Sequence, residues 1–257
     1  MISDLFQRTL YFMVKYMNRL IAAIEFLTIL PLGKTKTYDP QGMIPYFPIV
    51  GIILGAMVSA FDQVAIRLWS PPIASVLDVM LLVVLTAALH LDGLGDTADG
   101  LFGHRSREKA LTIMKDSRIG VMGLAAILGG LSLKWAGIAS LDTHRSLLLI
   151  IIPAYARGSM LFGIRFLEYG RPGHGTGHDF FNDPINTGAF LGLLVPIGLS
   201  YFLGWQGVWL NFIFAAITLS LLYYYKKRMG CITGDMLGAM VETTEALLFL
   251  LVSIRGF

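Results

Sequence analysis

The sequence has a single cysteine, Cys231, and few charged residues for its length. One cysteine excludes an internal disulfide and any metal site built from several thiolates. Charged residues make up 14% of the 257 positions, while 55% of the positions are hydrophobic. Soluble domains carry roughly a quarter of charged residues. With a mean hydropathy of +0.68, the chain is therefore predicted to be an integral membrane protein rather than a soluble one.

Seven apolar stretches recur along the chain, each near the length of about 20 residues that crosses a bilayer as a helix. They are Ile44–Trp69, Ile73–Leu91, Ile119–Ala139, Ser146–Leu167, Thr187–Trp205, Val208–Tyr225 and Met236–Ile254. No linker rich in proline, serine or charge divides them. We therefore expect one all-α domain over residues 1–257, a polytopic membrane helix bundle of about seven transmembrane helices.

Residues 1–40 form a different kind of segment. Arg8, Lys15 and Arg19 interrupt an apolar pattern that continues to Pro31. Charges within the apolar region, and no small-residue cleavage site after it, argue against a cleavable signal peptide. The pattern predicts an amphipathic helix that lies on the membrane surface.

Lysine and arginine gather in alternate loops of this expected bundle. The clusters are Lys34 with Lys36, then Arg105, Arg107, Lys109, Lys115 and Arg118, then Arg165 with Arg171, and finally Lys226, Lys227 and Arg228. Because cytoplasmic loops retain positive charge, these loops are predicted to face the cytoplasm of a cell (inner) membrane protein whose C-terminus lies outside. The net charge of +3 is explained by these loops without a nucleic-acid partner.

An acidic stretch, HLDGLGDTADG, follows the second apolar run. Asp92, Asp96 and Asp99 are spaced i, i+4, i+7, so they share one face if the helix continues past His90. Carboxylates this close repel one another unless a cation lies among them. Hard oxygen ligands at a membrane surface suggest Mg²⁺, which binds one or two carboxylates and leaves positions for substrate phosphates.

Cations follow the acidic stretch within the expected cytoplasmic active-site loop 92–118. Arg105, Lys115 and Arg118 lie a short distance beyond the aspartates. Phosphoryl transfer needs this pairing of metal ligands with cations that neutralise developing charge. For each cation the simpler alternative is a topology signal or a lipid-headgroup contact. Asp116 is either a further metal ligand or a partner for Lys115.

A second expected active-site loop spans residues 168–186 and is rich in glycine and histidine. Its composition is typical of a loop that covers substrate. His174 and His178 have helical spacing, but the surrounding glycines and Pro172 disfavour a helix, so a zinc site is not expected.

Three acidic residues belong to the last apolar stretch: Asp235 begins it, and Glu242 and Glu245 lie inside it. Acidic groups within a membrane helix are costly and usually face a cavity or a partner. The simpler alternatives are that Asp235 caps the helix and that Glu242 pairs with a buried arginine such as Arg157.

Four stretches resemble the signature sequences of the cobalamin synthase, or adenosylcobinamide-GDP ribazoletransferase, family. They are FLTILP at 26–31, HLDGLGDTADGLFG at 90–103, KDSRIGVMG at 115–123 and GDMLGAMVE at 234–242. The resemblance implies a membrane enzyme that joins adenosylcobinamide-GDP to α-ribazole or its 5′-phosphate, releasing GMP. It also implies a requirement for Mg²⁺, corrinoid and ribazole substrates, the lipid bilayer as surroundings, and a homo-oligomer or other cobalamin-assembly enzymes as partners.

This implied chemistry assigns roles to the residues above. Asp92, Asp96 and Asp99 would hold the metal, with Lys115 and Arg118 assisting catalysis. Substrate-binding residues would be His90, Arg105, Asp116, Arg157, Asp235 and Glu242. The group that removes the hydroxyl proton stays open among His90, Asp99 and Asp116.

Two other classes are weaker alternatives. The CDP-alcohol phosphotransferases share the opening of DTADGLFGHR, but Gly103 and His104 stand where that family has Ala and Arg, and its later paired aspartates are missing. An ion-coupled transporter would place its carboxylates near the middle of the membrane, whereas the densest cluster here ends an apolar run.

Overall fold

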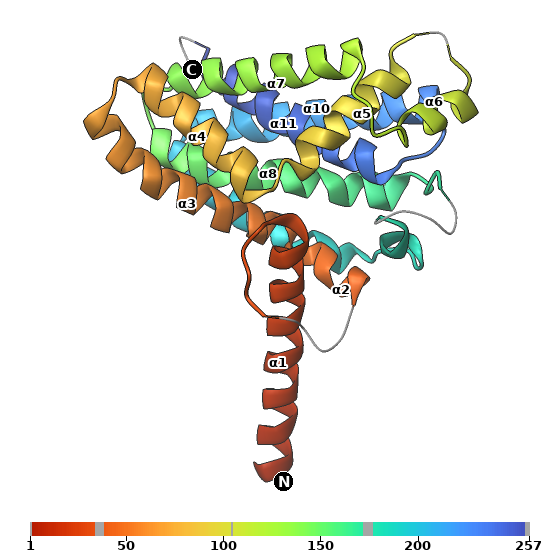
Figure 1. Cartoon of the computed structure of the whole chain (residues 1–257). Coiled ribbons are helices and arrows are strands. Elements are labelled where there is room, and N and C mark those ends of the chain that lie inside the picture. The colour runs from red at the N-terminus through yellow and green to blue at the C-terminus, as the bar shows by residue number, and fades with distance from the viewer. Residues whose placement is uncertain (1, 34–38, 104, 172–176, 255–257) are drawn as a thin grey trace.

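The computed structural model describes residues 2–33, 39–103, 105–171 and 177–254, and this part of the chain is helical with no β-strand (Figure 1). Its elements are α1 (Ile2–Leu27), α2 (Pro40–Met43), η1 (Ile44–Tyr46), α3 (Phe47–Leu68), α4 (Pro71–Leu85), α5 (Leu89–Leu101), α6 (Arg107–Ile113), α7 (Val121–Ala139), α8 (Arg145–Phe166), η2 (His178–Phe181), η3 (Thr187–Leu193), α9 (Leu194–Ser200), η4 (Tyr201–Leu203), α10 (Trp205–Arg228) and α11 (Gly234–Val252). The expected all-α fold is confirmed. Lys34, Lys36 and His174 lie outside the described residues.

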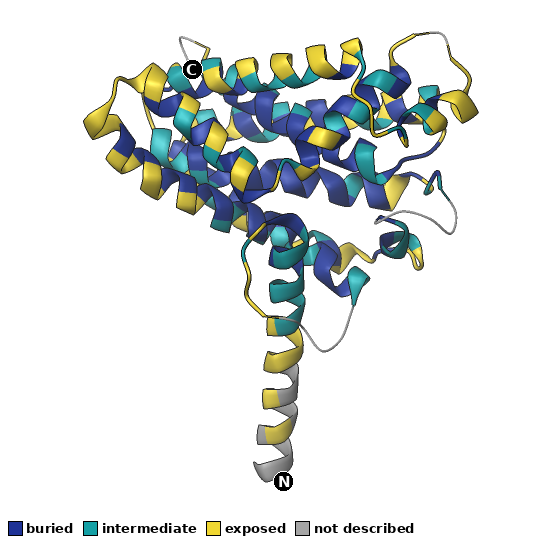
Figure 2. Ribbon diagram, viewed as in Figure 1, coloured by how far each residue is buried: buried dark blue, intermediate teal, exposed yellow. Residues whose placement is uncertain are grey.

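Helix α8 forms the centre of the bundle. Every residue from Ile151 to Leu161 is buried, and α3, α10 and α11 pack against this helix. Figure 2 shows the buried centre and the exposed outer faces of the surrounding helices. Those outer faces carry large apolar side chains, such as Val121 and Leu124 of α7. An apolar core covered by apolar outer faces is the pattern of a protein whose surroundings are lipid.

Four helical stretches are long and apolar enough to cross a membrane: Pro40–Leu68, α7, α8 and α10. The bent pair α4 and α5 adds a fifth if it counts as one span. The expected span Thr187–Trp205 is instead a shorter apolar series of η3, α9 and η4. A membrane helix bundle is thus supported, while the count of seven spans stays a prediction.

The expectation of one continuous helix through Ile73–Leu91 is wrong. Helix α4 ends at Leu85, and α5 begins at Leu89 in a direction 89° away. Ala87 and Ala88 have φ angles of 48° and 56°, a left-handed conformation that alanine seldom adopts. Ala88 N–H donates to the Val83 carbonyl at 2.9 Å, which closes the end of α4. The acidic stretch therefore forms a helix of its own.

Helix α1 projects sideways from the bundle, across the direction in which α3, α7 and α8 run (Figure 1). Only its C-terminal end packs on the body: Ala23 and Leu27 are fully buried, whereas Met13 and Met17 are exposed. The N-terminal helix is confirmed. A helix perpendicular to the spans has the direction that a membrane-surface helix requires.

Candidate functional site

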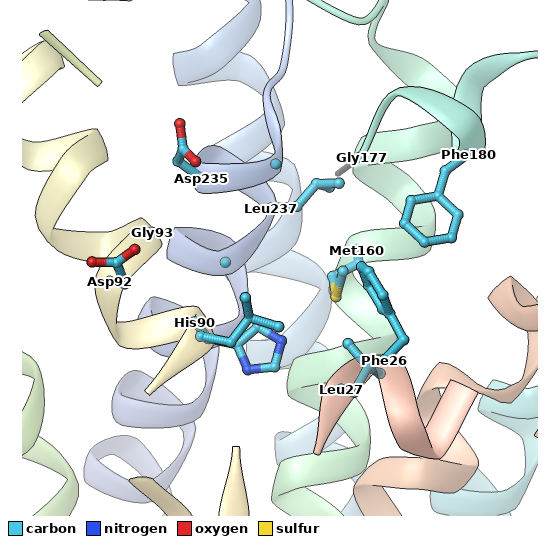
Figure 3. Close-up of a pocket in the computed structure, with 13 residues that line it drawn as sticks. Phe26, Leu27, His90, Asp92, Gly93, Met160, Gly177, Phe180, Asp235 and Leu237 are labelled. Atoms are coloured by element: carbon cyan, nitrogen blue, oxygen red, sulfur yellow. The ribbon is translucent and has the colours of Figure 1, made fainter. Parts of the chain in front are cut away.

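A pocket of about 170 Å³ lies where the end of α1, the middle of α8, the start of η2, and helices α5 and α11 meet. We call it the acidic pocket. Asp92 and Asp235 form one side, and Phe26, Met160 and Phe180 form the apolar side opposite them (Figure 3). Pockets for whole small molecules measure roughly 300–1,000 Å³, so this one admits only part of a large substrate.

Close packing of α5 on α11 brings the acidic residues together. A Cβ atom at Gly93 would lie 2.7 Å from the Asp235 carbonyl oxygen, so only glycine permits this approach. Asp92 of α5 and Asp235 of α11 consequently line the same pocket, and Asp96 lies one helical turn along α5 from Asp92. Arg171 pairs with Asp235 at 2.7 Å. The expected N-cap role of Asp235 is wrong, because the Thr233 hydroxyl accepts the Met236 N–H at the start of α11.

Asp99 has a different environment from Asp92 and Asp96. Its carboxylate accepts the backbone N–H groups of Gly120 at 2.6 Å and Gly123 at 2.8 Å, which closes the N-terminus of α7. A Cβ at Gly120 or Gly123 would overlap this carboxylate. Asp99 therefore joins α5 to α7. Among the described residues no three His, Cys, Asp or Glu side chains are assembled to hold a metal ion, so ligation by all three aspartates stays a prediction.

Arg118 and Asp116 pair with each other in the loop that precedes α7. The Arg118 Nη2 lies 2.6 Å from Asp116 Oδ2, and both side chains reach solvent. Hydrogen bonds from the Arg118 guanidinium and backbone hold the pKa of Asp116 at about 2. Of the two alternatives for Asp116, the pair with Lys115 is replaced by this pair with Arg118, and a role as metal ligand stays a prediction. None of these side chains lines the acidic pocket, although Gly120 connects their loop to Asp99.

Arg105 supports the end of α5. Its Nη1 donates to the backbone carbonyl of Asp99 at 2.7 Å. Arg228, at the end of α10, donates to the carbonyls of Gly103 at 2.8 Å and Arg105 at 3.0 Å. Arg105, Arg171 and Arg228 each belong to a different basic cluster of the sequence. All three lie at one end of the bundle, because Arg228 contacts the segment of Arg105 and Arg171 pairs with Asp235 at the start of α11.

Arg157 and Glu242 belong to a buried network of four charges that joins α7, α8 and α11. Lys134 of α7 contacts Glu242 at 2.7 Å and Glu245 at 2.5 Å, while Arg157 of α8 contacts Glu245 at 2.6 Å. The expected pair of Arg157 with Glu242 is therefore wrong: Arg157 pairs with Glu245, and Glu242 pairs with Lys134. Neither residue lines the pocket, and substrate contact by either stays a prediction.

His90 lies between this buried network and the acidic pocket. Its side chain lines the pocket, and neither ring nitrogen has a hydrogen-bond partner within the described residues. Figure 3 shows the ring on α5 beside α11. A buried imidazole without partners has both its donor and its acceptor available to a bound molecule.

Sequence reasoning missed Lys134, Arg171, Phe26 and Phe180 as parts of this region. Lys134 has a clear signal, because a lysine inside an apolar helix needs a partner as much as Glu242 does. Phe26 lies in the signature stretch at 26–31. Phe180 and Arg171 belong to the 168–186 loop, whose backbone pairs with Ile232 through Glu168 and Gly170. Phe180 carries no sequence signal for its position.

Comparison with known proteins identifies relatives across the whole fold. Residues 19–253 match the family described as cobalamin-5-phosphate synthase. A protein of Acetivibrio thermocellus named adenosylcobinamide-GDP ribazoletransferase is 30% identical over 248 residues, which cover 93% of this chain and 98% of that protein. Proteins with the same name from Alkaliphilus metalliredigens (36% identity, 91% and 95% covered) and Roseiflexus sp. (35%, 87% and 84%) are also similar. No solved structure matches the chain.

Proposed function

The chain belongs to the cobalamin-5-phosphate synthase family, and on that premise we propose that it is an adenosylcobinamide-GDP ribazoletransferase. Its donor is adenosylcobinamide-GDP, and its acceptor is α-ribazole or α-ribazole 5′-phosphate. A ribose hydroxyl oxygen bonds to the phosphorus that carries the cobinamide arm. The phosphoanhydride bond breaks, and GMP leaves with the bonding electron pair. The product is adenosylcobalamin or its 5′-phosphate.

The observation that carries this proposal is the excess of negative charge at the acidic pocket. Asp92 and Asp235 line this pocket, Asp96 lies one helical turn along α5 from Asp92, and Arg171 is the cation paired with Asp235. Such a group does not bind a diphosphate directly, because like charges repel. It fits Mg²⁺, whose preferred ligands are carboxylate oxygens and phosphate oxygens together. When bound, the ion would neutralise the negative charge that develops on the phosphate oxygens.

The residues of the chain have separate tasks in this mechanism. Asp92 and Asp235, which line the pocket, would hold the cation, and Asp96 would add negative charge one turn along α5. Asp99 keeps α5 fixed against α7 through its two backbone hydrogen bonds. The apolar side formed by Phe26 and Met160 excludes water from the diphosphate. His90 lines the pocket with unpartnered nitrogens, which supports its role as the proton acceptor for the ribose hydroxyl. Arg118 would break its ion pair with Asp116 and bind the phosphate.

A turnover assay tests this function. Purified protein in detergent or liposomes is supplied with adenosylcobinamide-GDP, α-ribazole 5′-phosphate and Mg²⁺, and GMP release is measured. We expect turnover that stops with a chelator and returns when Mg²⁺ is added. Turnover of cytidine diphosphate lipids in its place, or ion-coupled uptake into liposomes without GMP release, would replace the proposal with one of the alternative classes.

We also propose that the acidic pocket opens to the cytoplasm, as the lysine and arginine distribution predicts. In a Cys231→Ser background, Arg107→Cys introduces a thiol in α6, and Thr143→Cys introduces a matched thiol between α7 and α8. Membrane-impermeant labelling of sealed vesicles with cytoplasmic side inward should reach Thr143→Cys only. Labelling of Arg107→Cys alone would invert the topology.

A further inference from the structure

A second cavity, of about 440 Å³, lies on the other side of η2 from the acidic pocket. We call it the aromatic cavity. Tyr169, His178 and Phe181 line it, with ring centroids 4.9 Å apart for Tyr169 and Phe181 and 5.8 Å apart for Tyr169 and His178. Glu168 and Asp183 line it as well. Its volume falls within the range of sites that hold a small molecule.

Residues of one short segment separate the two cavities. Gly177 and Phe180 face the acidic pocket, whereas His178 and Phe181 face the aromatic cavity. A Cβ atom at Gly177 would lie 3.4 Å from the Tyr169 ring and 3.5 Å from the Cα of Gly234, the neighbour of Asp235. The two cavities therefore have this segment as a common wall.

We propose that the aromatic cavity binds the guanine base of the nucleotide whose phosphates lie at the acidic pocket, an assignment that rests on the proposed function. Aromatic side chains provide stacking surfaces for any base. Glu168 and Asp183 outnumber Arg165 in the lining, so the cavity itself disfavours phosphate. The phosphates are left on the acidic-pocket side of η2, where a bound cation would neutralise them.

The carboxylates in the lining select guanine over the other base in the reaction. Within the described part of the chain, the side chains of Glu168 and Asp183 form no ion pair or hydrogen bond, so both can accept from a ligand. Guanine presents two donors to such carboxylates, its N1–H and its N2 amino group. A ribosylated benzimidazole has no N–H donor and would leave the carboxylates unpaired. Sites built to hydrogen-bond a ligand reject analogues that lack the donor.

Equilibrium titration of the full-length protein in detergent with Mg²⁺ tests this assignment. The probes are GMP, IMP, which lacks the N2 amino group, and α-ribazole 5′-phosphate. We expect the wild type to bind GMP at least about tenfold more tightly than IMP, because IMP leaves a carboxylate unpaired. Phe181→Ala should raise the Kd of GMP at least about fivefold and leave the Kd of α-ribazole 5′-phosphate unchanged. Tyr201→Ala, an exposed aromatic outside the cavity, is the matched control.

A second variant distinguishes loss of the guanine site from loss of folding. Glu168→Gln with Asp183→Asn should reduce the preference for GMP over IMP to less than about threefold while GMP still binds, which a misfolded protein cannot do. Equal binding of GMP and IMP by the wild type would overturn the assignment. So would a Phe181→Ala loss confined to α-ribazole 5′-phosphate, because the base would then be the acceptor's. The turnover assay keeps this test separate from that of the proposed function. If GMP is released in turnover but GMP and IMP bind equally, only the guanine site is overturned. If GMP binds selectively but is not released in turnover, only the proposed function is overturned.

Discussion

Helix α11 meets charged neighbours at two levels, and their balance differs. In its middle, Glu242 and Glu245 pair with Lys134 and Arg157 at 2.5 to 2.7 Å. Two negative and two positive charges make this network neutral. At its start, Asp235 lines the acidic pocket together with Asp92, Asp96 lies one turn along α5, and Arg171 is the cation paired with Asp235. The first set is satisfied by the protein alone. The second has a negative excess that a bound cation would balance.

This difference separates charges that hold helices together from charges that await a ligand. A buried charge without a partner is costly, so a neutral network that joins α7, α8 and α11 contributes to a single arrangement of these helices. An unbalanced carboxylate group opposes folding through repulsion and persists where function requires it. Removing a charge should therefore have opposite effects on stability in the two places.

The largest expected effect is in the neutral network. Lys134→Met leaves Glu242 and Glu245 with Arg157 alone, and breaking a buried pair in this way costs about 3–5 kcal/mol. We expect a large fall in melting temperature and in the yield of monodisperse protein from detergent. The double variant Lys134→Met with Glu242→Gln restores neutrality and should recover most of both. A single variant that melts like the wild type would remove the network from the stability of the fold.

Asp96→Asn at the acidic pocket should separate activity from stability. Turnover should fall at least about 100-fold, the scale for losing one group that stabilises developing charge. The melting temperature should stay the same or rise, because one repelling carboxylate is gone. Rate against Mg²⁺ concentration, measured beside Asp235→Asn, shows whether cation affinity has fallen in each variant. A destabilised Asp96→Asn enzyme with normal turnover would make this group structural, like the neutral network.

Asp99→Asn should destabilise the fold, but less than Lys134→Met does. An amide has one acceptor oxygen, so it keeps one of the two N–H groups of Gly120 and Gly123 that the carboxylate accepts. Leaving the other unpaired should cost about 1–2 kcal/mol in unfolding free energy. Denaturation in detergent measures this cost, and Asp92→Asn, which makes no such cap, is the control. Equal stability of the two variants would contradict the capping role.

The smallest expected effect on stability belongs to the exposed pair of Arg118 and Asp116. The hydrogen bonds from Arg118 lower the pKa of Asp116 to about 2 from 3.8. A lowered carboxyl pKa stabilises the fold above the unfolded value, and this contribution is lost as the pH falls from 3.8 through about 2. Because solvent screens both groups, Arg118→Ala should leave the melting temperature at neutral pH unchanged.

The same Arg118→Ala variant should slow turnover at saturating substrate, because the proposed contact with phosphate strengthens in the transition state. Asp116→Asn is its matched control, since it frees Arg118 without removing it. Unchanged maximal rate in Arg118→Ala would exclude that contact.

Long apolar runs made much of the fold predictable. The expected stretches at 119–139 and 146–167 coincide with α7 and α8 to within two residues, because burial and lipid contact both demand unbroken apolar sequence. The break between α4 and α5 was not predictable. It occurs at Thr86, Ala87 and Ala88 without glycine or proline, and alanine is the best helix former.

The candidate site was predictable where charge interrupts apolar sequence. This rule identified Asp92, Asp96, Asp235 and Glu242, and it applies equally to Lys134, which was overlooked. It could not identify the partners of Asp99, because backbone N–H groups at Gly120 and Gly123 have no side-chain signal. Pair partners such as Glu245 for Arg157 depend on the rotation of packed helices, which sequence spacing alone does not determine.

The neutral network also imposes an order on biogenesis. Synthesis delivers α7 with Lys134 and α8 with Arg157 to the membrane before α11 leaves the ribosome. Arg157, near the middle of α8, costs roughly 2.5–3.5 kcal/mol in an inserted helix until its carboxylate arrives, and Lys134, closer to the end of α7, costs less. Helix α11, with two buried acids of its own, is not among the helices apolar enough to insert by composition. We therefore expect the bundle to become stable only when the last helix docks, and a chain truncated before Gly234 to be unstable in the membrane.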